Sequence, residues 1–381
     1  MAGELASLRP AHARVDLSRL KENYASVRAF AGLPLIPVVK ADAYGHGAME
    51  VARYLAGLGA SLMAVAFPEE GRALRKAGIG ADLLVLSFGA SQAELVVDEK
   101  MIPVVSTDEG LEAFLKAARG AGRTVACHIE VDTGMARLGF ASDGLERRLG
   151  RLLDSGVVDV QGIMTHLACA DENAERTEGQ LDLFDRCLER LDKAQIRPRI
   201  VHAAHSAGLP HVRKTHTHVR PGLLLYGLKP RPRAPQIDVR PVMSVHAGVL
   251  VVKSHAPGTP VSYGGRWVSA TPSRVATLPI GYADGVPRTR AMETGGFLSR
   301  GDDRLAVAGA VCMDFMMVDV TGAEVREGDE VTLFGDEPSA WDLAGWAGTT
   351  VWQILTGVGP RLARVYVEEG QIVAVHGPTL S

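Results

Sequence analysis

Lys40 is the residue of this chain best placed for covalent chemistry. It follows the apolar run of residues 35–39, which predicts a buried strand, and it precedes a turn that contains Gly45 and Gly47. A lysine at the mouth of a strand has its stem in apolar surroundings, and desolvation there lowers the pKa of its amine. Such an amine can attack a carbonyl and form a Schiff base. A solvated lysine that ends a strand is the alternative for Lys40 taken alone.

Four further polar residues lie at or just beyond the ends of later strand-like runs. They are Arg137, His166, Ser206 and Arg220. In a barrel of parallel strands the C-terminal ends converge, so these side chains and Lys40 would meet around one pocket. Each of them alone could equally be a solvated residue of the rim; together they indicate a functional site.

Strand-like runs alternate with helical patterns through the first two thirds of the chain. The predicted strands cover residues 35–39, 62–67, 83–87, 102–105, 125–131, 160–165, 200–204 and 216–220. Eight successive β-then-α units predict a parallel sheet closed into a (β/α)8 TIM barrel. An open, doubly wound sheet is the alternative, but no G-x-G-x-x-G motif follows the first strand.

Helix start signals lie between these predicted strands. Asp16 is expected to cap a helix whose apolar residues follow helical spacing. Pro68, followed by two glutamates, predicts the start of a second helix. Ser106 with Glu109 three residues later predicts a capping box at the start of a third.

The pattern changes at residues 230–241, which are rich in proline and arginine and predict a linker. Beyond them, short alternating runs separated by Gly, Pro and Asp predict a mostly β domain, with a short helix starting near Trp341. These runs cover residues 244–252, 273–278, 305–311, 316–320, 330–334 and 364–367. We therefore divide the chain into a barrel of residues 11–238 and a mostly β C-terminal domain of residues 239–381.

Length and composition narrow the class of protein. The chain has 381 residues, which favours two domains, and it is 46% hydrophobic and 22% charged, as in ordinary globular enzymes. A net charge of -3 gives no electrostatic reason to bind nucleic acid or an anionic membrane. No apolar run reaches membrane-spanning length, and the N-terminus lacks signal-peptide features, so we expect a cytoplasmic protein. The four cysteines form no C-x-x-C pair and predict neither a disulfide framework nor a metal site.

The segment Arg220-Pro221-Gly222-Leu223 could bind a phosphate. Phosphate binding requires backbone N–H groups in a tight turn together with a few hydroxyl groups, and a glycine allows the backbone to approach closely. Ser206 could add a hydroxyl contact. Without further context, Gly222 could also be an ordinary turn glycine.

Seven sequence blocks, in the same order along the chain, resemble the alanine racemase family. They are residues 40–47 (KADAYGHG), 131–139 (VDTGMARLG), 165–168 (THLA), 220–222 (RPG), 261–264 (VSYG), 279–285 (PIGYADG) and 311–314 (VCMD). The first block resembles the family's pyridoxal-phosphate lysine signature. The resemblance implies a pyridoxal-phosphate barrel followed by a β domain, with residues 1–10 packed on that second domain.

The resemblance also implies how the reaction is carried out. Lys40 and Tyr263 would be the two bases that exchange the α-proton on opposite faces of an amino acid bound to pyridoxal phosphate. In the family this tyrosine comes from the partner subunit, which implies a homodimer with shared active sites. Because an ordinary tyrosine is a poor base at neutral pH, nearby positive charge must stabilise its phenolate; Arg137, and Arg220 acting through His166, are the candidates.

The remaining binding residues are assigned by the same resemblance. Arg220 would face the pyridine nitrogen; because a guanidinium keeps its proton, it leaves that nitrogen unprotonated and favours reprotonation over transamination. The cofactor phosphate would be held by Tyr44, Ser206, Gly222 and Leu223. Arg137 and the backbone N–H of Met313 would bind the substrate, beside Cys312 and Asp314, and Tyr282 would line the entrance.

Three residues depart from the family's pattern. Glu130 stands where many members have a carbamylated lysine, and our hypothesis is that its carboxylate serves directly as the anionic partner of Arg137. His205 replaces the usual asparagine, and Trp352 replaces a tyrosine that touches both phosphate and substrate. An indole offers only an N–H donor and is bulkier, so the phosphate contact would be rerouted, for instance to His205, and larger substrates would react poorly.

The sequence thus predicts interconversion of L-alanine and D-alanine, with the product used for a bacterial cell wall. A racemase of serine, lysine or arginine is the first alternative, because a change of one group in a pocket shifts preference by only about 1–3 kcal/mol. A pyridoxal-phosphate decarboxylase and a non-catalytic pyridoxal-phosphate-binding protein are the others. Tyr263 and Arg220 argue against the decarboxylase, and a second base argues against the pure binder.

Overall fold

The computed structural model describes residues 8–378, which divide into two compact units. One unit comprises residues 21–43 and 48–239, and the other comprises residues 8–20, 44–47 and 240–378. The sequence-based boundary between residues 238 and 239 stays a prediction.

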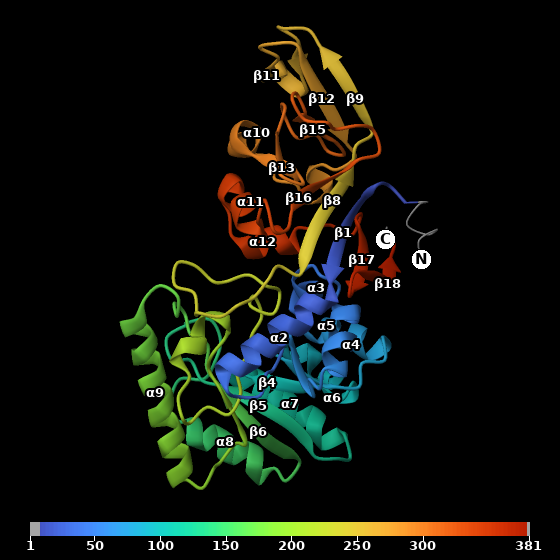
Figure 1. Cartoon of the computed structure of the whole chain (residues 1–381). Helices are drawn as coiled ribbons and strands as arrows, with labels where there is room; N and C mark the ends of the chain where they lie inside the picture. Colours follow the sequence, from blue (N-terminus) through green and yellow to red (C-terminus); the bar gives the residue numbers. More distant parts are fainter. Residues whose placement is uncertain (1–7, 379–381) are drawn as a thin grey trace. The chain divides into compact units, whose positions relative to one another are not determined.

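Six parallel strands in the order β2 to β7 form the sheet of the first unit. Figure 1 labels β4, β5 and β6 of this sheet. They are β2 (Leu62–Val65), β3 (Asp82–Val85), β4 (Ile102–Val105), β5 (Val125–Glu130), β6 (Val158–Met164) and β7 (Ile200–His202). Nearly every residue of β2 to β4 is buried, as expected for parallel strands covered on both faces.

Two short extended segments close this sheet into a barrel. In the first segment, Val38 pairs with Ala64 of β2, and Leu35 pairs with Val219 of the last segment. On the other side of the last segment, Arg220 pairs with His205 just beyond β7. The predicted first and eighth strands are therefore present as bridged segments, and the predicted (β/α)8 barrel is confirmed.

Helices follow the strands as the sequence predicts. They are α2 (Leu17–Ala31), α4 (Ala48–Gly57), α5 (Pro68–Lys76), α6 (Ala93–Asp98), α7 (Asp108–Gly120), α8 (Leu145–Asp154) and α9 (Ala174–Lys193). The Asp16 carboxylate accepts a hydrogen bond from the Arg19 N–H at 3.1 Å, which confirms the predicted cap of α2. The predicted capping box at Ser106 is wrong, because Thr107 is the extended residue that accepts the N–H of Gly110 at 3.0 Å.

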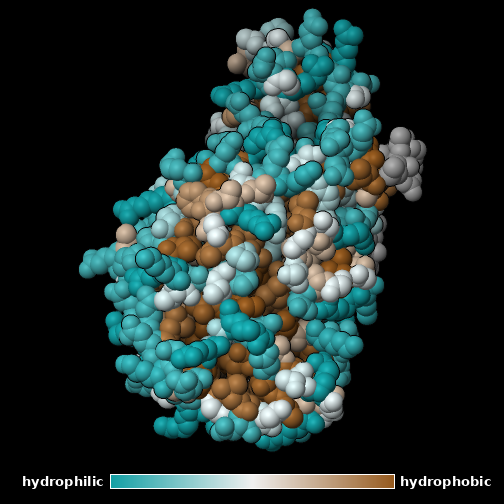
Figure 2. All heavy atoms as spheres, turned by 60° about the horizontal axis from the view of Figure 1, so that its bottom comes forward, coloured by the Kyte–Doolittle hydropathy of each residue, from teal (hydrophilic) through white to brown (hydrophobic). Residues whose placement is uncertain are grey.

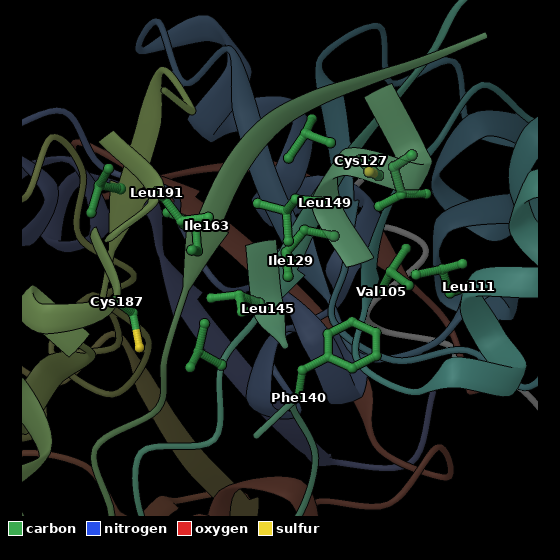
Figure 3. Close-up of a cluster of buried hydrophobic side chains, with 14 of the residues drawn as sticks. Val105, Leu111, Cys127, Ile129, Phe140, Leu145, Leu149, Ile163, Cys187 and Leu191 are labelled. Carbon is green, nitrogen blue, oxygen red and sulfur yellow. The ribbon is translucent and has the colours of Figure 1, made fainter. Parts of the chain in front are cut away.

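A hydrophobic cluster lies between β4 to β6 and helices α7 to α9 (Figure 3). Val105, Ile129 and Ile163 come from three neighbouring strands, and Leu111 and Leu149 come from the helices that cover them. All four cysteines of the chain are free thiols, and two of them lie in this cluster. The packing of this cluster fixes the strands whose C-terminal ends carry the candidate site.

The second unit is mostly β, as predicted. A seven-stranded sheet runs in the order β14-β13-β16-β8-β1-β17-β18, beside the three-stranded sheet β15-β12-β9 and the pair β10-β11. The strands are β1 (Ala11–Asp16), β8 (Met243–Gly248), β9 (Val251–His255), β10 (Pro260–Val261), β11 (Trp267–Val268), β12 (Ser273–Leu278), β13 (Phe297–Arg300), β14 (Asp303–Ala306), β15 (Met316–Asp319), β16 (Glu330–Phe334), β17 (Ala363–Glu368) and β18 (Gln371–His376). The helices are α10 (Arg290–Gly295), α11 (Ala340–Ala347), which confirms the helix expected near Trp341, and α12 (Val351–Thr356).

Strand β1 was not foreseen from the sequence. It pairs with β17 in parallel and with β8 in antiparallel orientation, near the middle of the large sheet. Of the segment expected to pack with this domain, residues 1–7 lie outside the described part of the chain, and Arg9 belongs to this unit.

Hydrophilic side chains cover much of the face drawn in Figure 2, with hydrophobic areas between them. Among residues 8–378, no helix has both the length and the apolar character that a membrane span requires.

Candidate active site

Lys40 is the first residue of a left-handed helical turn. In α3 (Lys40–Tyr44), residues Ala41, Asp42 and Ala43 have φ angles of 51°, 54° and 54°, and Tyr44 also has a φ of 54°. A left-handed helical conformation costs roughly 1–2 kcal/mol for each residue that is not glycine. The turn therefore requires bonds from neighbouring elements to hold it.

Two carboxylates provide such bonds. The Ala41 N–H donates to Glu70 Oε1 at 2.7 Å, and the Asp42 Oδ1 accepts the N–H of Ala48 at 2.7 Å. Glu70 lies on α5, in the first turn of the helix. From the sequence, Glu70 was recognised only as part of a helix start signal and not as a residue of the site.

The environment of Lys40 lowers the pKa of its amine. Burial is the largest cause, and the guanidinium groups of Arg137 and Arg220 lower the pKa further. The carboxylate of Glu70 acts in the opposite direction. An amine of lowered pKa can lose its proton more readily near neutral pH, which is what a catalytic base requires.

Arg220 is buried and held by an extensive set of hydrogen bonds. Its Nη1 donates to Nδ1 and to the C=O of His202 at 2.6 and 2.9 Å. Its Nη2 donates to the C=O groups of Thr165 and Ala203 at 2.9 and 3.2 Å and lies 3.5 Å from Nδ1 of His166. Within residues 8–378 the Nε–H has no acceptor, so it is the donor that remains for a ligand.

Arg220 remains positively charged although it is buried. Desolvation lowers the pKa of the guanidinium to about 10, with Glu130 raising it and Arg137 lowering it. A pKa of about 10 still leaves the group protonated at neutral pH. A pyridine nitrogen that accepts the Nε–H would therefore remain unprotonated.

Glu130 is a buried carboxylate at the end of β5. Burial raises its pKa, and Arg220 and Arg137 act against that rise. No ion pair joins Glu130 and Arg137 in the described part of the chain, so the hypothesis of a direct contact gains no support from this conformation. The Arg137 guanidinium affects the Glu130 carboxylate only through the electrostatic attraction between their charges.

His166 and His205 stack with their ring centroids 5.0 Å apart. Burial lowers the pKa of both, that of His205 to about 4, so both rings are neutral at pH 7. His205 Nε2 donates to the C=O of Leu167 at 3.1 Å, and its Nδ1 accepts the N–H of Ala207 at 3.2 Å. With both ring nitrogens engaged, His205 caps the 3₁₀ helix η2 (Ser206–His211) and has no donor left for a phosphate.

Ser206 organises the turn that was predicted to bind phosphate. Its Oγ accepts the N–H groups of Gly222 and Leu224 at 3.0 and 3.2 Å. Because Oγ accepts both, its own proton is free to point elsewhere. Among residues 8–378, neither the Leu223 N–H nor the Ser206 hydroxyl proton has an acceptor, so these two donors, rather than the Gly222 N–H, are available to an anion.

In the second unit, Tyr263 projects from a strained turn. Tyr263 is the first residue of the 3₁₀ helix η3 (Tyr263–Gly265), and 68% of its surface is exposed. The preceding residue, Ser262, has a φ of 66°, and its Oγ donates to the C=O of Ala310 at 2.7 Å and lies 3.5 Å from Sγ of Cys312. Ser262 therefore ties Tyr263 to the Cys312 loop.

The segments that carry Tyr282 and Met313 are bonded to each other. The Tyr282 N–H donates to the C=O of Cys312, and the Ala283 N–H donates to the C=O of Met313, both at 3.0 Å. Gly281 permits this approach, because a Cβ there would lie 2.4 Å from both carbonyl oxygens. In the described chain the Met313 N–H has no acceptor, as expected of a group that binds a carboxylate.

The buried carboxylate of Asp284 holds the same segments by hydrogen bonds. Its side chain is fully buried and accepts two hydrogen bonds from Arg9, at 2.9 and 2.8 Å, and the Gly281 N–H at 3.0 Å. Arg361 lies 3.4 Å from Asp284 and donates to Asp314 at 2.7 Å. The Asp314 carboxylate thus fixes its loop through Arg361.

Trp352 and Tyr44 lie on adjacent segments of the second unit. Trp352, on α12, contacts the ring of Trp341 edge to face, with centroids 6.2 Å apart. Gly45, next to the buried Tyr44, runs so close to α12 that an added Cβ would lie 2.2 Å from the Leu355 carbonyl oxygen. The tryptophan is thus placed on a segment that packs against the backbone beside Tyr44.

The structure therefore gathers the predicted residues in two sets, one for each unit. The barrel set comprises Lys40, Arg137, His166, His205, Ser206, Arg220, Gly222 and Leu223, and the second set comprises Tyr44, Tyr263, Tyr282, Cys312, Met313, Asp314 and Trp352. Sequence reasoning missed Glu70, Ser262 and Asp284 as site-positioning residues. Two of these three stand inside motif blocks, but only the hydrogen bonds show what they do.

Comparison with known proteins gives a consistent result. Residues 15–230 match the family model "Alanine racemase, N-terminal domain", and residues 242–366 match "Alanine racemase, C-terminal domain". An alanine racemase of Halothermothrix orenii is 39% identical over 94% of this chain and 97% of its own length. One of Symbiobacterium thermophilum is 39% identical over 95% of this chain and 98% of its own length. Among solved structures, an alanine racemase of Clostridium difficile has a TM-score of 0.91 and 30% identity, covering 97% of this chain and 99% of that one.

The two domain matches together cover most of the chain, and the two relatives match it along nearly their whole length. The barrel of parallel strands and the β-rich second unit agree with those matches. From sequence and fold alike, this chain belongs to the alanine racemase family.

Proposed function

We propose that this protein interconverts L-alanine and D-alanine with pyridoxal phosphate as its cofactor. One observation carries the proposal. Lys40, an amine of lowered pKa, stands at the same barrel rim as the buried Arg220, whose Nε–H has no acceptor among residues 8–378 and is available to a ligand. The full-length similarity to proteins named alanine racemase supports alanine as the substrate.

The donors at the barrel rim fit pyridoxal phosphate. The Leu223 N–H and the Ser206 hydroxyl suit its phosphate, the Nε–H of Arg220 suits its pyridine nitrogen, and the Lys40 amine suits its aldehyde. When bound, the cofactor would supply an electron sink for the pair left behind by the α-proton.

The chain's own residues would move the proton. Lys40 removes or returns it on one face of the amino acid, and Tyr263 does so on the other. His166, neutral and with Nδ1 facing Arg220, carries its proton on Nε2 and can donate from there toward the tyrosine oxygen. Arg137 and the Met313 N–H would hold the substrate carboxylate.

The exposure of Tyr263 supports a homodimer with shared active sites. It is 68% exposed, and the nearby Met313 and Phe315 are 52% and 44% exposed, an unusual concentration of large apolar groups for a free surface. A tyrosine that completes the partner's site would be uncovered in a single subunit. The cytoplasmic location and the use of D-alanine for a cell wall stay predictions.

The direct test is conversion of L-alanine to D-alanine by the purified protein with pyridoxal phosphate, detected with a D-amino-acid oxidase. Conversion that is lost in Lys40→Ala supports the proposal. No conversion of alanine, but conversion of serine, lysine or arginine, would identify a racemase of another amino acid. Release of CO2 would identify a decarboxylase.

Shared sites are tested by mixing two inactive variants. A dimer of one Lys40→Ala subunit and one Tyr263→Phe subunit would contain one intact and one doubly defective site if Tyr263 acts in its partner's site. Random exchange makes half of the dimers mixed, so about a quarter of wild-type activity should return. No recovery, with exchange verified by differently tagged subunits, would contradict shared sites.

A further inference from the structure

The turn that follows Lys40 needs an external support. Four consecutive residues that are not glycine, Ala41 to Tyr44, have φ angles between 51° and 54°. Such a run is rare for L-residues and persists only where surrounding groups hold it. The direction of the Lys40 side chain depends on this turn because Lys40 is its first residue.

Glu70 joins this turn to the neighbouring strand with a single carboxylate. Its Oε1 accepts the Ala41 N–H at 2.7 Å, and its Oε2 accepts the Ala66 N–H at 2.6 Å and the Phe67 N–H at 3.4 Å. Ala66 directly follows β2, the strand that pairs with the segment leading into Lys40. Both carboxylate oxygens are used, and both are bonded to backbone groups.

The charge of Glu70 is also suited to this position. Lys40 lies under the influence of two guanidinium groups, Arg137 and Arg220, which disfavour its protonated form, and Glu70 is the acid that counteracts them. Loss of the Glu70 charge would therefore leave the amine less basic. The hydrogen bonds of Glu70 and its negative charge therefore both affect Lys40.

We propose that Glu70 is a positioning residue, which fixes the left-handed turn after Lys40 and so holds the Lys40 amine in place for proton transfer. The inference rests on the proposed function of Lys40 as a base. It predicts that a carboxylate of this length is required. Glutamine offers one acceptor oxygen instead of two, and aspartate is one methylene too short to reach both strand and turn.

Glu70→Gln is the test, with Glu69→Gln as the matched control. Glu69 is the preceding residue on the same helix; it is exposed and accepts a hydrogen bond from Gln92 Nε2 at 2.8 Å. Both variants remove one negative charge from the first turn of α5. Only Glu70→Gln breaks the connection to Ala41.

Three measurements are made on each holoenzyme. Amide hydrogen exchange of the peptide that contains Ala41 should be about tenfold faster in Glu70→Gln, since one hydrogen bond is lost. The kcat for alanine should fall about 10- to 100-fold with little change in KM, because a displaced base impairs proton transfer more than binding. The pH dependence of the bound cofactor's absorbance should move to lower pH, as a less basic Lys40 requires.

Wild-type exchange, kcat and pH dependence in Glu70→Gln would overturn the inference. If Glu70→Gln does not fold, Glu70→Asp replaces it, because aspartate keeps the charge but not the reach; a wild-type kcat in that variant would likewise overturn the inference. If wild type and Glu69→Gln do not racemise alanine at all, the proposed function fails. The exchange of the Ala41 amide then still decides whether Glu70 holds the turn.

Discussion

Replacement of Asp284 by asparagine should destabilise the second unit selectively. The Asp284 side chain is fully buried, accepts two hydrogen bonds from Arg9 and one from the Gly281 N–H, and lies 3.4 Å from Arg361. Asparagine has the same shape but no charge, and only one of its two terminal atoms can accept a hydrogen bond. At least one bond to Arg9 or Gly281 must be lost, together with the attraction to both arginines.

The size of the effect follows from these contacts. A hydrogen bond to a charged group contributes about 1.5–3 kcal/mol, and removal of one partner of a fully buried ion pair costs about 3–5 kcal/mol. The side chains of Arg9 and Arg361 are 25% and 34% exposed, so water can solvate them again after the substitution. We therefore expect Asp284→Asn to lower the free energy of unfolding by about 2–3 kcal/mol.

Tryptophan fluorescence measures this unit alone. All four tryptophans of the chain, at positions 267, 341, 346 and 352, lie in the second unit. Urea titration followed by their fluorescence gives the midpoint and slope of its transition without a signal from tryptophan in the barrel. The matched control is Asp336→Asn: Asp336 also accepts two hydrogen bonds from one arginine, Arg19, but its side chain is 64% exposed.

The control pair should contribute less than about 1 kcal/mol, as exposed ion pairs do. The Arg9→Ala and Asp284→Asn variants should also be non-additive, because the two residues share one contact. A loss of less than about 0.5 kcal/mol in Asp284→Asn, or a loss no larger than in Asp336→Asn, would refute the argument that burial makes this ion pair important.

Three further predictions follow from individual residues. Gly281→Ala should raise KM for alanine about tenfold in steady-state kinetics, because its Cβ would push away the carbonyl groups of Cys312 and Met313. This shift would displace the Met313 N–H, which we propose binds the substrate carboxylate. Burial lowers the pKa of His216 to about 4. Between pH about 6.5 and 4 the unfolded chain therefore binds a proton that the folded chain does not, and the free energy of unfolding decreases as the pH is lowered through this range. In urea titrations followed by circular dichroism, His216→Asn should reduce that slope by up to about 1.4 kcal/mol per pH unit; an unchanged slope would contradict the assignment. Trp352→Tyr should increase turnover of serine relative to alanine, measured as a ratio of kcat/KM values; an unchanged ratio would contradict a role for the indole in narrowing the site.

Periodicity predicted the barrel because each strand and helix carries its own local signal. Residues 102–105, 273–278 and 330–334 were predicted with the bounds that the structure gives to β4, β12 and β16. Burial on both faces makes barrel strands continuous apolar runs, and one exposed face makes the strands of the second unit alternate. The first and eighth barrel strands were also found, although each forms only isolated bridges.

Features that depend on distant pairing were not predictable. Strand β1 alternates apolar and polar residues over Ala11–Asp16, but this short pattern does not show that it pairs with β8 and β17, more than 200 residues later. Arg9 and Asp284 are separated by 275 positions, so no local pattern connects them. The left-handed turn after Lys40 contains no glycine, and one of the carboxylates bonded to it, that of Glu70, lies 29 positions after Ala41.

The motif blocks located the candidate site residues, but hydrogen bonds refined their roles. The Gly222 N–H is already bonded to Ser206, whereas the Leu223 N–H has no acceptor in the described part of the chain. Both ring nitrogens of His205 are bonded within the barrel, which argues against the prediction that His205 takes over a contact to the phosphate. Such assignments depend on donor and acceptor positions, which residue types alone do not give.

The most direct test of the central claim is the exchange of the α-hydrogen of L-alanine and D-alanine in deuterated water, with wild type and Tyr263→Phe. Two bases on opposite faces predict that wild type exchanges both enantiomers while it racemises them. The variant, left with Lys40 alone, should lose racemisation and exchange the hydrogen of one enantiomer only. Racemisation at the wild-type rate, or equal exchange of both enantiomers by Tyr263→Phe, would contradict the account.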